Sequence, residues 1–166
     1  IYTVVMRIKR NLSLNYSDKT RHKKKIKFVI IHYTGMQSEI ASIKRLKNSK
    51  AKVSCHYLIN RKGEITQMVK ENKVAWHAGK SYWRGYRDLN SRSLGIELVN
   101  LGNEPYPEAQ MKRLISLLKH LTKSYEISPK NVLGHSDIAP SRKSDPGECF
   151  NWKELSNSGL ALFPEA

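Results

Sequence analysis

Two histidines and one aspartate have the residue types and positions of a metal site. His32 and His135 each follow a short apolar run, and Asp145 comes ten residues after His135. Two imidazoles and one carboxylate make a three-ligand tetrahedral zinc site with the fourth position left for water. Spacing alone is weak support, because the two histidines lie 103 residues apart. The alternative is that each is a buried, hydrogen-bonded structural histidine.

The elements that must position these side chains alternate between strands and helices. Apolar runs predict strands, and apolar side chains repeated every three or four residues predict helices. The predicted strands are 28–31, 53–59, 65–69, 94–99 and 131–134, and the predicted helices are 38–46, 108–125 and one beginning near residue 152. This order predicts one α/β domain with a central mixed β-sheet flanked by helices. In such sheets ligands bind at the carboxyl ends of the strands, where His32, Glu97 and His135 lie.

Length and composition exclude several classes of protein. The chain has 166 residues, of which 39% are hydrophobic and 27% charged, as expected for a single globular domain. No apolar run approaches the roughly 18 residues that a membrane span needs. Two cysteines, Cys55 and Cys149, are too few for a disulfide-dense scaffold or a four-cysteine zinc module. We expect Cys149 to pack as a small apolar side chain.

The net charge of +16 is concentrated at the start of the chain. Residues 1–27 hold nine basic residues and one acidic residue, half of the excess. We therefore divide the chain into a basic lead-in segment, 1–27, ahead of the first strand, and a domain, 28–166, which contains the candidate metal ligands. Such a charge fits nucleic acid, an anionic membrane, an anionic polymer or simple solubility. No zinc finger or helix-turn-helix pattern supports the nucleic-acid reading, and no nucleic-acid partner is predicted.

Six short blocks, in order, carry a resemblance to a known family. They are 31–36 (IHYTGM), 53–59 (VSCHYLI), 75–79 (AWHAG), 93–98 (SLGIEL), 134–140 (GHSDIAP) and 142–147 (RKSDPG). Together they resemble the zinc-dependent N-acetylmuramoyl-L-alanine amidases of the AmpD and AmiD type, over about residues 26–165. That family shares its fold with phage lysozyme-type amidases and peptidoglycan recognition proteins. The resemblance implies a mixed sheet with one zinc ion in a surface groove.

The resemblance also assigns roles to individual residues. It implies that His32, His135 and Asp145 hold zinc, and that Glu97 and Lys143 are catalytic. The reaction is then hydrolysis of the amide between N-acetylmuramic acid and L-alanine, in peptidoglycan or anhydro-muropeptides. A zinc-bound water is the expected nucleophile, with Glu97 as general base and then acid, and Lys143 stabilising the oxyanion. The sequence contains no His-Glu-x-x-His motif, which disfavours a zinc peptidase.

Substrate contacts are predicted for four further residues: Lys52, Trp76, His77 and Arg87. Lys52 matches a family arginine that reads stem-peptide carboxylates. At the second such position the chain has Asp88, so Arg87 beside it is the expected substitute. Trp76 is suited to stacking on a sugar ring, and relatives place His77 in the groove. His56, in mid-strand, is interpreted instead as a structural or second-shell histidine.

Two questions stay open at this stage. A non-catalytic peptidoglycan-binding module is the alternative function, although such modules typically lack part of the zinc set. The location is open because AmpD-type enzymes are cytoplasmic and AmiD-type enzymes lie in the cell envelope. The ending, 152–166, resembles that of the AmiD-type catalytic domain, which favours the envelope or periplasm. The sequence indicates no transmembrane segment and no particular oligomeric state.

Overall fold

A computed structural model describes residues 6–163 of the chain. The strands are β1 (Ile8–Arg10), β2 (Tyr16–Thr20), β3 (Phe28–Tyr33), β4 (Tyr57–Ile59), β5 (Ile65–Gln67), β6 (Lys73–Ala75), β7 (Ser93–Leu98) and β8 (Val132–Gly134). The α-helices are α1 (Glu39–Lys47), α2 (Glu108–Ser124), α3 (His135–Ile138) and α4 (Trp152–Asn157), and short 3-10 helices occupy Lys23–Lys25 and Pro129–Asn131. Among the described residues, no helix has both the length and the apolarity to cross a bilayer.

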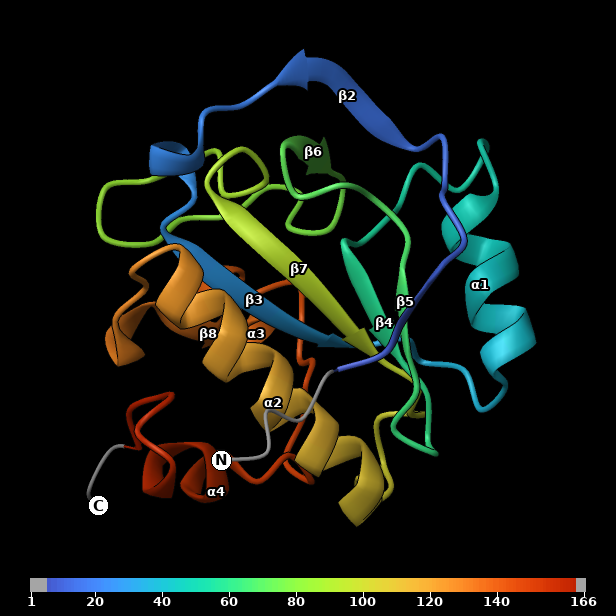
Figure 1. Cartoon of the computed structure of the whole chain (residues 1–166), viewed down its shortest axis with the longest axis vertical. Helices are drawn as coiled ribbons and strands as arrows, with labels where there is room; N and C mark the ends of the chain where they lie inside the picture. Colours follow the sequence, from blue (N-terminus) through green and yellow to red (C-terminus); the bar gives the residue numbers. More distant parts are fainter. Residues whose placement is uncertain (1–5, 164–166) are drawn as a thin grey trace.

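Six strands form the central sheet in the order β1-β5-β4-β7-β3-β8 (Figure 1). β4 and β5 pair as an antiparallel hairpin, whereas the pairs β1–β5, β4–β7, β7–β3 and β3–β8 are parallel. β2 and β6 make a separate antiparallel pair. The prediction of an α/β domain with a mixed central sheet is confirmed.

The two faces of the central sheet carry different side chains of β3 and β7. Alternate residues of β3 and β7 pack with α2 and α4 in the main core: Val29, Ile31, Leu94, Ile96 and Leu98. Successive side chains of a strand point to opposite faces, so the intervening residues face away from α2. His32 and Glu97 are such residues, and the β3–β7 register places them directly beside one another. Strand alternation therefore carries both polar side chains to the face that α2 leaves open.

The predicted strand at 53–59 is shorter than expected. Only Tyr57–Ile59 forms β4. His56 still bonds to β7, through its N–H to the carbonyl of Gly95 at 3.0 Å, but Ser54 bonds to the loop that follows β6. The backbone N–H of Ser54 donates to the carbonyl of Trp76 at 2.8 Å, and the Ser54 hydroxyl accepts from the N–H of Trp76 at 2.8 Å. This exchange holds the 75–79 block next to the sheet.

The basic segment 1–27 does not precede the first strand, which corrects the sequence prediction. β1 is the first strand, and it lies at the edge of the central sheet beside β5. After β1 the chain crosses the end of α1, where Ser13 Oγ donates to the carbonyl of Leu46 at 2.7 Å. Asn15 Nδ2 donates to the carbonyl of Asn48 at 2.9 Å. The described part of the segment is thus built into the domain, and residues 1–5 lie outside the described residues.

Arg21 anchors this segment to the loops above the sheet. Its side chain is buried, and Nε donates to the carbonyl of Glu71 at 3.0 Å while Nη1 donates to that of Asn90 at 3.1 Å. Burial lowers the pKa of Arg21 to about 10, which still leaves it charged at neutral pH. Part of the basic excess is therefore structural, because this cation binds backbone carbonyls.

We expect Arg21→Ala to lower the free energy of unfolding by about 2–4 kcal/mol, because it leaves buried carbonyls without their charged donor. Urea unfolding followed by circular dichroism measures this change. Lys19→Ala is the control, since Lys19 is an exposed basic residue of the same segment. Equal stability of the two variants would contradict an anchoring role.

Candidate active site

The candidate metal ligands come from two adjacent strands and one loop. Ile31 of β3 pairs with Gly134 of β8 in parallel register. The next residue along each strand is a histidine, so the chain places His32 and His135 side by side. His135 is also the first residue of α3. Asp145 lies in the loop after α3, where its carbonyl accepts from the N–H of Ser136 at 2.9 Å. This bond ties the loop to the helix that carries His135.

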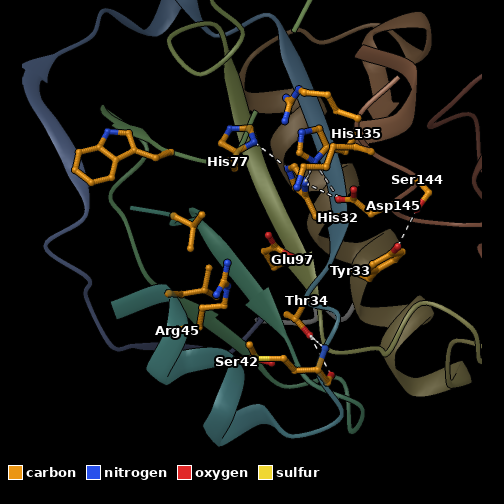
Figure 2. A pocket seen from close by; sticks show the side chains of 16 residues that line it. His32, Tyr33, Thr34, Ser42, Arg45, His77, Glu97, His135, Ser144 and Asp145 are labelled. Carbon is orange, nitrogen blue, oxygen red and sulfur yellow. Dashed lines mark hydrogen bonds and ion pairs between the residues drawn. The ribbon is translucent and has the colours of Figure 1, made fainter. Parts of the chain in front are cut away.

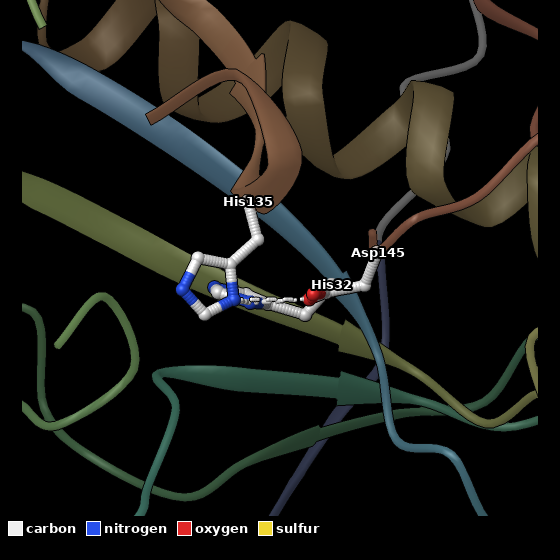
Figure 3. Close-up of side chains that lie close together, drawn as sticks. All are labelled: His32, His135 and Asp145. Carbon is white, nitrogen blue, oxygen red and sulfur yellow. Dashed lines mark hydrogen bonds and ion pairs between the residues drawn. The ribbon is translucent and has the colours of Figure 1, made fainter. Parts of the chain in front are cut away.

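The three side chains converge on one point (Figure 3). His32 Nδ1 lies 3.0 Å from His135 Nδ1 and 2.9 Å from Asp145 Oδ2, and His135 Nδ1 lies 3.2 Å from the same oxygen. All three residues are buried. They form a group whose ligand atoms could hold a metal ion.

The protonation of the group fits a metal. His135 Nε2 lies 2.9 Å from the carbonyl of Ala78, which can only accept, so a neutral ring keeps its proton there. Its Nδ1 lone pair then points at the Asp145 carboxylate, and two acceptors at this distance repel unless a cation lies between them. Burial lowers the pKa of His32, which favours the neutral, ligating form. Burial works to raise the pKa of Asp145, but its close contacts with the His135 and His32 rings outweigh burial and hold that pKa well below its usual range.

A cavity of about 350 Å³ opens over this group (Figure 2). It lies on the sheet face opposite α2, between α1 and the loop that carries Asp145. Its walls are formed by His32, Tyr33, Thr34, Met36, Ser42, Arg45, Leu46, Val53, Trp76, His77, Glu97, His135, Arg142, Lys143, Ser144 and Asp145. The predicted ligands and both predicted catalytic residues therefore share one pocket.

Glu97 brings a buried carboxyl oxygen into the pocket. Its Oε2 is buried and makes no hydrogen bond within the described part of the chain. Burial raises its pKa well above the usual value, and the charge of Asp145 raises it further. A carboxyl group with an unpaired oxygen and a raised pKa, beside a candidate metal site, has the properties of a group that exchanges protons during a reaction.

Lys143 lies two residues before Asp145 on an exposed part of the loop and lines the same pocket. It makes no ion pair with a carboxylate among residues 6–163. The positive charge of its ammonium group is therefore available to a ligand in the pocket.

The four predicted substrate residues divide into two pairs. Trp76 and His77 line the pocket, whereas Lys52 and Arg87 do not. Lys52 is exposed in the turn after α1, and the Arg87 guanidinium lies 5.3 Å from the centre of the Tyr82 ring. His77 is only 7% exposed, and both ring nitrogens have partners: Nδ1 lies 2.9 Å from His32 Nε2, and Nε2 lies 3.0 Å from Ser93 Oγ. Both ring nitrogens of His77 therefore contact other side chains of the protein.

Two arginines in the pocket were not predicted from the sequence. Arg45 projects from α1, and Arg142 from the loop after α3. Arg142 Nη2 donates to the carbonyls of Ala78 at 3.1 Å and Lys80 at 2.6 Å. Arg45 lies between Lys44 and Lys47 on an amphipathic helix, so no sequence signal separates it from these basic neighbours. Only the packing of α1 beside the sheet brings it to the pocket.

The remaining candidates have structural roles or lie outside the site. His56 is fully buried, with Nδ1 accepting from the N–H of Gly95 at 3.0 Å and Nε2 donating to the carbonyl of Lys73 at 2.9 Å. This agrees with its prediction as a structural histidine. Cys55 is buried, but Cys149 is exposed, so the prediction that Cys149 packs as an apolar side chain is wrong. It lies in the surface loop that follows Asp145.

Comparison with known proteins gives a consistent result. Residues 22–148 match the protein family described as N-acetylmuramoyl-L-alanine amidase. The chain is 41% identical over 160 residues to N-acetylmuramoyl-L-alanine amidase AmiD of Escherichia coli (strain K12), covering 86% of this chain and 56% of AmiD. It is 46% identical over 101 residues to 1,6-anhydro-N-acetylmuramyl-L-alanine amidase AmpD of the same strain, covering 61% of this chain and 55% of AmpD. The chain thus spans little more than half the length of these curated relatives.

Solved structures support the same grouping. One is a complex of AmiD from E. coli with the substrate anhydro-N-acetylmuramic acid-L-Ala-D-gamma-Glu-L-Lys. Its TM-score is 0.80 at 38% identity, over 90% of this chain and 63% of that one. A crystal structure of an AmpD derivative also has a TM-score of 0.80, at 30% identity over 91% of this chain and 93% of that one. Both similarities extend over nearly all of the described residues.

Proposed function

Because the chain belongs to the N-acetylmuramoyl-L-alanine amidase family, we propose that it hydrolyses the amide bond between N-acetylmuramic acid and L-alanine. The observation that carries the proposal is the single pocket in which His32, His135 and Asp145 converge beside the unpaired carboxyl of Glu97. The substrate class is peptidoglycan or its anhydro-muropeptide fragments. E. coli AmiD, a similar protein, has been captured with such a fragment.

We assign the three converging side chains to one zinc ion. Two imidazoles and a carboxylate are a donor set that catalytic zinc sites use. When bound, zinc would act as a Lewis acid on the lactyl carbonyl and make a water acidic enough to attack at neutral pH. The neutral form of His32 and the ionised form of Asp145 are the states that such a site requires.

Glu97 and Lys143 would carry the rest of the reaction. The Glu97 carboxylate takes the proton of the attacking water, and the resulting carboxyl group delivers it to the L-alanine nitrogen as the C–N bond breaks. The Lys143 ammonium stabilises the negative charge that develops on the carbonyl oxygen. The products are a sugar with a free lactyl carboxylate and a peptide with a free L-alanine amine. Water supplies the oxygen and both hydrogens, so the reaction balances without a further reactant.

Substrate would enter between α1 and the loop after α3. Trp76 is half-buried at the wall, with its indole N–H bonded to Ser17 Oγ at 3.1 Å, so one ring edge is held by the protein. Arg45 and Lys143 add positive charge on either side of the pocket, which suits stem peptides that carry carboxylates. We further propose action in the cell envelope rather than the cytoplasm, because the sequence similarity to AmiD covers 86% of the chain and that to AmpD covers 61%.

The test is digestion of intact sacculi and of purified anhydro-muropeptides in parallel, with products identified by mass spectrometry. We expect new L-alanine amines and lactyl carboxylates, loss of cleavage with a chelator, and recovery with added Zn²⁺. Binding to sacculi without cleavage of either substrate would support the alternative of a non-catalytic peptidoglycan-binding module. Cleavage that a chelator leaves unchanged would contradict the zinc mechanism. The substrate that is cleaved faster identifies the physiological class.

A further inference from the structure

We propose that Asn90 is a positioning residue of the metal site, although it is not one of the residues that line the pocket. Asn90 holds the dipeptide His77–Ala78, and this dipeptide determines which ring nitrogen of each histidine ligand faces the metal. The inference rests on the proposed zinc site and identifies the groups that prepare it.

A first chain of hydrogen bonds runs from Ser93 through His77 to His32. The carbonyl of Leu89 can only accept, so the Ser93 hydroxyl donates to it, at 2.5 Å. Ser93 Oγ then accepts from His77 Nε2, 3.0 Å away, which places the His77 proton on that nitrogen. His77 Nδ1 is left as an acceptor for the Nε2 proton of His32 at 2.9 Å (Figure 2). The Nδ1 lone pair of His32 is thereby directed to the centre of the site.

A second hydrogen bond, made by the adjacent residue Ala78, orients His135. The carbonyl of Ala78 accepts from His135 Nε2 at 2.9 Å, which leaves the Nδ1 lone pair of His135 directed to the same centre. Two consecutive residues therefore orient the two ligands, one through a side chain and the other through a backbone carbonyl. A shift of this dipeptide would disturb both ligands together.

Asn90 and Gly95 hold the dipeptide in place. Asn90 Oδ1 accepts from the backbone N–H groups of both His77, at 3.0 Å, and Ala78, at 2.7 Å. The His77 ring lies against Gly95 of β7, where a Cβ atom would come within 2.5 Å of His77 Cγ. The dipeptide is thus fixed by one side-chain amide and by a close approach to the sheet that only glycine permits.

Asn60 offers a matched control for Asn90. Its Oδ1 also accepts from two backbone N–H groups, those of Lys62 at 3.0 Å and Glu64 at 2.8 Å. These bonds hold the β4–β5 turn, and Asn60 is not among the residues of the pocket wall. Asn60→Ala therefore removes the same kind of clamp without touching the ligand histidines.

The experiment measures the Zn²⁺ dissociation constant by competition with a chromophoric chelator, and the melting temperature of the metal-free proteins. We expect Asn90→Ala to weaken Zn²⁺ binding by about 10–100-fold, the range typical of groups that orient metal ligands. Asn60→Ala should lower the melting temperature but leave the Zn²⁺ dissociation constant within about twofold of the original protein. Asn90→Asp keeps an acceptor oxygen and should recover most of the affinity.

Ser93→Ala is a second variant, because it removes the acceptor for His77 Nε2 and leaves Asn90 intact. It should also weaken Zn²⁺ binding by about 10-fold or more. Unchanged Zn²⁺ affinity in both Asn90→Ala and Ser93→Ala would overturn the inference. Failure of the unaltered protein to bind Zn²⁺ would instead overturn the proposed zinc site on which the inference rests.

Discussion

Glu97→Gln is expected to lower kcat by about 10²–10⁴-fold while the enzyme keeps its zinc, because glutamine preserves the shape of the side chain but can neither accept nor deliver the proton. The unpaired Oε2 of Glu97 makes the substitution structurally mild, since no hydrogen bond of that oxygen within residues 6–163 is lost. Initial rates of muropeptide cleavage, with metal content determined by atomic absorption, measure both parts of the prediction.

The control for this variant is Glu64→Gln, which removes a carboxylate from the surface. Glu64 forms an exposed ion pair with Lys9 at 2.8 Å and does not line the pocket. It should keep the rate of the original enzyme. A Glu97→Gln enzyme that binds zinc and still cleaves at a near-normal rate would remove Glu97 from the proposed mechanism.

Asp145→Ala is expected to abolish measurable cleavage together with high-affinity Zn²⁺ binding. The carboxylate is the only charged member of the predicted ligand set, and its loss leaves two neutral imidazoles 3.0 Å apart. Lewis-acid stabilisation contributes several kcal/mol to such reactions, so we expect a fall in kcat/KM of about 10³-fold or more. Calorimetric titration with Zn²⁺ and a muropeptide cleavage assay measure the two effects.

Asp137→Ala is a suitable comparison for Asp145→Ala. Asp137 Oδ2 accepts from the N–H of Gly134 at 2.8 Å at the start of α3, so it supports the helix that carries His135 without belonging to the predicted ligand set. It should weaken stability but retain a measurable zinc site. If Asp145→Ala binds Zn²⁺ as tightly as the original protein does, the aspartate is not a ligand.

The sequence predicted those parts of the fold that local patterns encode. Apolar runs identified β3, β7 and β8, and helical periodicity identified α1 and α2 to within two residues at each end. It did not identify β1 and β2, because Ile8–Arg10 and Tyr16–Thr20 are largely exposed and polar or basic. Their strand conformation comes from pairing with β5 and β6, and a pairing partner distant in the chain leaves no local pattern.

The candidate site was also predicted only in part from the sequence. Residue types and family blocks were enough to select His32, His135, Asp145, Glu97 and Lys143, all of which line the pocket. Strand alternation together with parallel register explains why His32, His135 and Glu97 converge, and the loop after α3 adds Asp145 to them. Their chemical roles remain proposals that the variants above test.

What the sequence determined by itself is which residues have chemistry to offer and which strands carry them, because side-chain type and periodicity are local properties of a chain. What only the tertiary structure decided is how those groups are oriented and charged. Lys52 and Arg87 lie outside the pocket, Arg45 lies inside it, and His77 contacts His32. These outcomes depend on backbone carbonyls and on the packing of α1 and the loops. Every residue has a backbone carbonyl, so the sequence does not show which carbonyls will bind these side chains. Only the folded chain selects them.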